Sequence, residues 1–96
     1  MERLLQADRL LIVGLVPQAA AIYQAILQAE PRNPAALIGL ANCTVEEGDF
    51  RGGYALALRA LEVDRTNNVA LRLEARLSEI LAVRGEPVRR PGWITR

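Results

Sequence analysis

The side chains that most often carry out enzymatic chemistry are scarce in this 96-residue chain. It contains no histidine and no lysine, all 12 basic residues are arginines, and Cys43 is its only cysteine. Most general bases and activated nucleophiles depend on those residue types. A single cysteine also excludes an intrachain disulfide and a cysteine-built metal site. We therefore expect no catalytic residue, no cofactor and no metal ion.

Three acidic residues, Glu46, Glu47 and Asp49, stand close together at the end of a predicted helix. Carboxylates can hold a metal ion, but no further ligand type lies nearby. A solvated helix end is the favoured interpretation, with Asp49 as the N-cap of the next helix. The glycine pair that follows is not a phosphate-binding loop, because no strand precedes it.

Two small residues have alternative interpretations. Cys43 lies in the middle of a predicted helix, which favours a small core residue over a reactive thiol. Gly52 and Gly53 lie inside another predicted helix, where each costs ~1 kcal/mol relative to alanine. Either Gly53 allows two helices to approach closely, or that helix begins one turn later.

Composition limits the partners. Apolar residues make up 51% of the chain and aromatic residues 4%, with leucine and alanine dominant, which suits closely packed helices. A net charge of +1 creates no overall electrostatic field that would steer the chain to nucleic acid. The longest apolar run, residues 10–16, is too short to span a bilayer, and no cleavable signal pattern precedes it. We expect a cytoplasmic protein with no membrane insertion and no nucleic-acid partner.

Turn residues recur at a fixed interval of 34 residues, which separates Gly14 from Gly48 and Asn33 from Asn67. Such a period in a helical pattern is typical of stacked helix-turn-helix repeats. Glycine, proline and asparagine delimit five predicted helices, over about 2–13, 17–29, 34–47, 49–63 and 68–84. Residues 85–96 have no period of their own and are predicted to form an irregular tail.

Residues 34–67 resemble a tetratricopeptide repeat, whose signature is W-x2-L-G-x2-Y, then A-x3-F, then P. The matching positions are Leu37, Leu40, Ala41 and Thr44, followed by Gly53 and Ala57, while the stretch 1–33 offers Ala7, Leu10, Ala19, Tyr23 and Pro31. Arg65 replaces the closing proline. The resemblance implies an all-α fold, a short right-handed α-solenoid of antiparallel helix pairs with about five helices. It implies a domain over residues 1–84, with repeats at about 1–33 and 34–67 and a final helix at 68–84.

The family resemblance also implies a concave groove that holds an extended peptide or a partner helix. The first helix of each pair lines such a groove, and the matching positions here are Leu4, Leu5, Asp8, Leu11, Ile12, Ala35, Ile38, Gly39, Asn42, Val45, Val69, Arg72, Leu73, Arg76 and Ile80. Asn42 matches a position where the family often bonds a ligand's backbone. Arg72 and Arg76 could grip an acidic group, or Arg76 could pair with Glu79. The basic clamp of chaperone-binding members is largely absent, since Leu4 and Asp8 occupy two of its positions.

The last predicted helix, 68–84, is apolar most of the way round, so something should cover its second face. The tail, the same helix of a second copy or a different subunit could do so. Trp93, the only tryptophan, either folds back onto this helix or anchors a partner. Binding of nucleic acid by Trp93 and three arginines is a third, weaker alternative. We therefore predict a non-catalytic adaptor or assembly module that self-associates or docks through the last helix and tail. The alternative is a receptor that binds a peptide in the groove.

Overall fold

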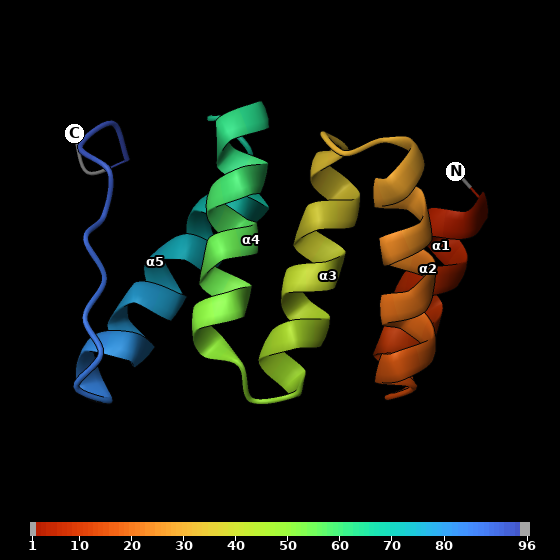
Figure 1. Ribbon diagram of the computed structural model, residues 1–96, viewed down its shortest axis with the longest axis horizontal. Coiled ribbons are helices and arrows are strands. Elements are labelled where there is room, and N and C mark those ends of the chain that lie inside the picture. Colours follow the sequence, from red (N-terminus) through yellow and green to blue (C-terminus); the bar gives the residue numbers. More distant parts are fainter. Residues whose placement is uncertain (1, 95–96) are drawn as a thin grey trace.

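The computed structural model describes residues 2–94, which form five helices and no strand (Figure 1). The helices are α1 (Glu2–Ile12), α2 (Val16–Ala29), α3 (Pro34–Glu46), α4 (Phe50–Val63) and α5 (Asn68–Val83). Each helix packs on the next, and α1 also contacts α3. The helices therefore form a stack, with α1 and the C-terminal segment at opposite ends of its 35 Å long axis (Figure 1). The predicted all-α solenoid is confirmed.

The turns show why the sequence repeats. The helices α1, α3 and α5 each end at a glycine with positive φ, namely Gly14 (86°), Gly48 (88°) and Gly85 (79°). After each glycine the next amide donates back to a carbonyl in the last helical turn, as a left-handed C-terminal cap requires. Asparagine caps start α3 and α5, because the Asn33 and Asn67 side chains accept from the amides of Ala36 and Ala70.

Two details at helix starts qualify the sequence-based interpretation. The helix α2 begins at Val16, one residue before the predicted start, so Pro17 is its second residue. The helix α4 begins at Phe50 with Asp49 as its cap, the Asp49 carboxylate accepting from Gly52 N at 2.8 Å. Gly52 and Gly53 therefore lie in the first turn of a complete helix, and the later start is wrong.

The core lies along α3, which is covered on both sides. Six of its residues are buried, against one in α1. Cys43 is fully buried, which confirms its core position. Close approach of the helices is also confirmed at Gly53, where an added Cβ would lie 2.6 Å from Val45 Cγ2 and 3.3 Å from Ala41 O.

The tail folds back and covers α5. Val88, Trp93 and Ile94 pack against the core cluster formed by α3, α4 and α5. The guanidinium of Arg65, in the turn before α5, lies 4.4 Å from the centre of the Trp93 ring. In Figure 1 the tail runs along the outer edge of the stack beside α5. The tail of the same chain thus supplies the predicted cover for the last helix.

The buried stripe of α5 is less apolar than expected. It contains Glu74 and Ser78 besides Ala70, Leu73, Leu77 and Leu81. Glu74 is fully buried, and Arg90 from the tail pairs with it. Among residues 2–94 no helix has both the length and the apolar character that crossing a membrane would require.

Candidate binding groove

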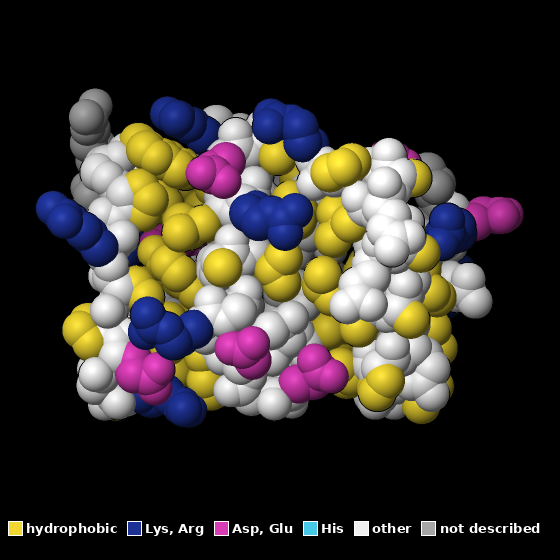
Figure 2. Space-filling model, in the orientation of Figure 1, with side chains coloured by type: hydrophobic (Ala, Val, Ile, Leu, Met, Phe, Trp, Pro, Cys, Tyr) yellow, Lys and Arg dark blue, Asp and Glu magenta, His cyan; other side chains and the backbone are white. Residues whose placement is uncertain are grey.

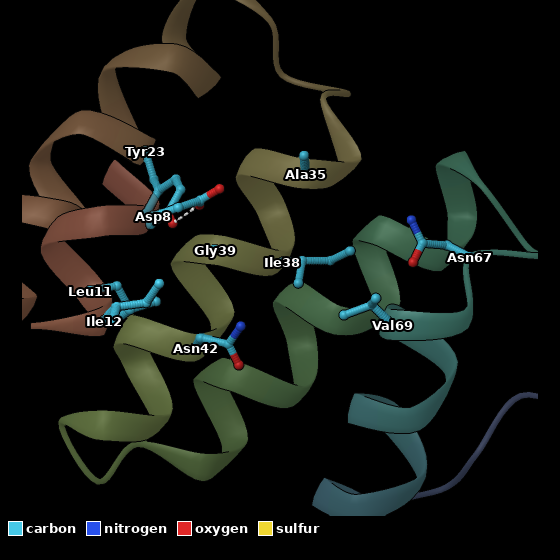
Figure 3. A pocket seen from close by; sticks show the side chains of 10 residues that line it. All are labelled: Asp8, Leu11, Ile12, Tyr23, Ala35, Ile38, Gly39, Asn42, Asn67 and Val69. Atoms are coloured by element: carbon cyan, nitrogen blue, oxygen red, sulfur yellow. Dashed lines mark hydrogen bonds between the residues drawn. The ribbon is translucent and has the colours of Figure 1, made fainter. Parts of the chain in front are cut away.

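The helices α1, α3 and α5 line a hollowed surface. Its largest part, about 480 Å³, lies between α1, α3 and the start of α5. Figure 3 shows side chains from all three helices around it, with Ile38, Asn42 and Val69 projecting into the space between α3 and α5. Two further hollows continue along α5 and along the end of α3. Together they form one groove on the face where the family resemblance implies it.

Asn42 occupies the centre of this groove. It contributes to the walls of all three hollows, and its residue is only half-buried. Its side-chain amide makes no hydrogen bond within residues 2–94. An amide carries both donors and an acceptor, so it can satisfy the two polar groups of a peptide backbone unit. Asn42 therefore presents two donors and an acceptor to the groove.

One end of the groove is apolar and is built on a buried tyrosine. Tyr23 of α2 reaches over α3, and its ring lies where a Cβ on Gly39 would have to be. Its hydroxyl donates to the Asp8 carboxylate of α1, and burial raises the pKa of Tyr23, with Asp8 adding to the effect. The tyrosine thus stays a hydrogen-bond donor and fixes Asp8 on the groove wall. Exposed Ile12 and Val69 complete the apolar surface.

The other end carries positive charge. Arg72 and Arg76, one turn apart on α5, both line the groove and are both exposed. Within the described part of the chain neither makes an ion pair or a hydrogen bond, so the predicted Arg76–Glu79 pair does not form. Glu46 lies near Arg76 on the wall of one hollow. The two guanidiniums remain available for an acidic group.

The structure places most predicted groove residues together on these walls. They are Asp8, Leu11, Ile12, Ala35, Ile38, Gly39, Asn42, Val45, Val69, Arg72, Leu73 and Arg76.

Three predicted partner-binding residues lie elsewhere. Leu4 packs against the α1–α2 cluster and lines a separate hollow with Ile26. Ile80 packs against the core near the tail, and Trp93 lies on the tail beside Arg65. Leu5 lines none of the three hollows of the groove and is half exposed. The helical residues Leu4, Leu5 and Ile80 lie outside the groove because a straight helix can present only a stripe of its surface to it.

Three groove residues were not predicted, and one of them, Glu46, was expected only as part of a solvated helix end. Tyr23 comes from α2, the second helix of its pair, and only the missing side chain of Gly39 lets it reach the groove. The spacing of a large aromatic residue and a glycine does not reveal such a contact. Asn67 was predicted only as a turn residue, and it both caps α5 and lines the hollow.

The remaining candidate sites are the acidic cluster and Cys43. Glu46, Glu47 and Asp49 are exposed, and Asp49 acts as a helix cap. Among residues 2–94 no three His, Cys, Asp or Glu side chains are grouped so that they could hold a metal ion. Burial, and then the charge of Glu47, raises the pKa of the Cys43 thiol to about 11, so it is protonated near neutral pH.

The sequence profile of one known family, described as the tetratricopeptide repeat, matches residues 10–77. No curated protein and no solved structure matches the chain. The matched segment runs from the end of α1 to the middle of α5, and so includes all four turns between the helices and the central wall of the groove. This chain belongs to the tetratricopeptide repeat family.

Proposed function

We propose that this protein is a non-catalytic interaction module that binds a segment of a partner protein in the groove of α1, α3 and α5. Tetratricopeptide repeats generally mediate protein–protein interactions, and such domains are typically not catalytic. The observation that supports the groove most strongly is Asn42. Its unbonded amide stands where three hollows meet, and the walls of the largest of the three are mostly apolar.

The chemistry of the walls suggests the chemistry of the partner segment. Apolar side chains would pack against Ile12, Ile38 and Val69, where burial contributes about 25 cal/mol per Å². An acidic side chain would lie at the other end, beside Arg72 and Arg76, because guanidinium groups bind carboxylates through two parallel hydrogen bonds. The proposed ligand is therefore a mainly apolar segment with an acidic residue near one end.

The other predicted role is self-association or docking through the last helix and tail. Its basis was the apolar second face of α5, and the tail of the same chain now accounts for that face. Assembly through α5 would require the tail to leave its place. The groove needs no such rearrangement, so we take groove binding as the primary function.

The test is selection of random 12-residue peptides displayed on phage against the wild-type protein. Selected peptides are expected to combine apolar residues with an acid. Asn42→Ala, and Arg72→Ala with Arg76→Ala, should each weaken their binding at least tenfold, which is about 1.4 kcal/mol. The matched control is Arg59→Ala, an exposed arginine on α4 outside the groove. Peptides that bind all four proteins equally would show that the groove is not the binding surface.

A further inference from the structure

A fully buried carboxylate lies between α4, α5 and the tail. Glu74 of α5 is 0% exposed, yet both of its oxygens have partners. Arg90 Nε donates to Oε2 at 2.7 Å and Arg90 Nη2 to Oε1 at 2.6 Å, while Tyr54 Oη of α4 donates to Oε2 at 2.8 Å. This is a two-pronged arginine–carboxylate pair, the geometry that a lysine or a neutral side chain cannot reproduce.

The rest of the tail adds a second contact type. Trp93, three residues after Arg90, packs on the core cluster and stacks under the Arg65 guanidinium. Val88, two residues before Arg90, packs on the same cluster. Figure 2 shows hydrophobic side chains gathered between the tail and α4. Arg90 and Trp93 are therefore bound at two different places on the same surface. Arg90 pairs with Glu74, whereas Trp93 contacts the core cluster and Arg65.

The tail resembles a bound peptide more than an integral element. Residues 86–91 have no regular secondary structure and follow the turn at Gly85. On the receiving side, Tyr54 and Glu74 belong to the helices α4 and α5, and the side chain of Glu74 is completely enclosed, whereas that of Arg90 is 34% exposed. Side chains thus provide the main recognition of the tail by α4 and α5.

We propose that this α4–α5 surface is a second binding site, specific for an extended segment that carries an arginine, with residues 86–94 as its resident ligand. The occupant it accepts in place of its own tail is the tail of a second copy of this chain. That segment carries the matched set of side chains, Val88, Arg90 and Trp93. The exchange joins two molecules, and the second copy completes the Glu74 site of the first.

The energetics explain when exchange occurs. Both arrangements make the same contacts, so the attached tail is favoured in a single intact chain by its high effective concentration. Substitution of Arg90 removes the favoured ligand from the attached tail. It also leaves the buried Glu74 carboxylate without its partner, which is strongly unfavourable. An intact tail from another molecule then becomes the better ligand. The groove plays no part in this exchange.

Two full-length variants, each defective on one side of the contact, provide the test. Arg90→Ala keeps the Glu74 site but loses the ligand, whereas Glu74→Gln keeps the ligand but loses the carboxylate. Mixed in equal amounts, they should form a 1:1 heterodimer, detected by native mass spectrometry and light-scattering chromatography. Each variant alone should be mainly monomeric. Absence of heterodimer from the mixture of the folded variants would overturn the proposal.

A synthetic peptide of residues 85–94 gives a second measurement that does not depend on the Glu74→Gln variant. It should bind full-length Arg90→Ala, and a peptide with alanine at position 90 should bind at least tenfold more weakly. A peptide with alanine at Arg89, an exposed neighbour, is the matched control and should bind normally. Equal binding of all three peptides, or binding of none, would contradict recognition through Arg90.

Circular dichroism checks that Arg90→Ala retains its helices. If that variant does not fold, Arg90→Lys replaces it, since lysine keeps the charge and loses the two-pronged bond. Wild-type peptide should then bind Arg90→Lys more tightly than it binds the intact protein, whose site is filled. Identical binding to both would overturn the proposal.

Discussion

At the scale of single residues, two buried tyrosines join helices by the same device. Tyr23 donates its hydroxyl to Asp8 of α1, and Tyr54 donates to Glu74 of α5. Burial, and then the bonded carboxylate, raises the pKa of both phenols. A neutral phenol can therefore satisfy a carboxylate in the interior without adding a charge. One such pair forms the groove wall, and the other forms the receiving side of the tail.

Cys43 leads to a prediction about pH. Its pKa rises from 9.0 to about 11 on folding, mainly because the thiol is buried. The stability from keeping the thiol neutral is complete below about pH 9 and is lost as the pH rises to about 11, since the unfolded chain ionises first. The expected loss is about 2 to 3 kcal/mol. Urea unfolding of the wild type and of Cys43→Ala, measured from pH 8 to pH 11, gives the difference.

The comparison isolates the thiol, because the tyrosines titrate in both proteins. The free energy of unfolding of Cys43→Ala should fall less steeply over this range, whatever its value at pH 8. If the two curves run parallel, the thiol is not responsible for the pH dependence.

At the scale of helices, α3 and α4 approach each other closely at Gly53. Gly53→Ala would stabilise an isolated helix by ~1 kcal/mol. In this protein the added methyl would meet Val45 Cγ2 at 2.6 Å, and such overpacking costs about 1–3 kcal/mol. We expect a net destabilisation of about 1 kcal/mol in urea unfolding. Val45→Ala removes the contacting methyl, so the double variant should be more stable than the sum of the single effects predicts.

A stabilised Gly53→Ala protein would contradict the close packing of α3 on α4. If the stability changes of the two single variants simply add in the double variant, Val45 is not the cause of the destabilisation. The cause is then the backbone carbonyl of Ala41, which would lie 3.3 Å from the added Cβ.

The helices could be predicted from the sequence because their ends are set by local chemistry. Asn33, Asp49 and Asn67 start helices by capping them, and Gly14 and Gly48 end others with positive φ, all of which depends on neighbours along the chain. The 3.6-residue period then places Asp8, Ile38 and Asn42 on one side. Local rules of this kind explain the helix bounds and most of the groove positions.

The long-range pairings could not be predicted in the same way. Glu74 lies on the buried side of α5. The sequence alone would place a charged side chain of this kind in solvent. Glu74 is buried only because Arg90, 16 residues further on, returns to pair with it. No periodicity links a helix to an irregular segment, so the contact depends on tertiary packing. Trp93 lies on the same tail as Arg90, so its position depends on the same long-range packing. For this reason the sequence alone could not decide whether Trp93 folds back or anchors a partner.

At the scale of the whole molecule, stability should vary along the stack, because each helix contacts mainly its neighbours. Six residues of α3 are buried and only one of α1. Local opening should therefore be easiest in α1 and hardest in α3 and α4, because α3 and α4 pack most extensively on neighbouring helices and contact density sets the free energy of opening. Amide hydrogen exchange of the wild type, followed by mass spectrometry after pepsin digestion, should be slowest in α3 and α4 and fastest in α1.

In Arg90→Ala, the rate of hydrogen exchange should change at one end of the stack and not at the other. Loss of the Glu74 partner should speed exchange in α5 at least tenfold, since every 1.4 kcal/mol is a factor of ten. Exchange in α1 and α2 should not change, because the stack transmits a local loss only to the adjoining helix. Arg89→Ala is the matched control and should leave all five helices as in the wild type. Equal acceleration from α1 to α5 would instead show that the stack opens as one cooperative unit.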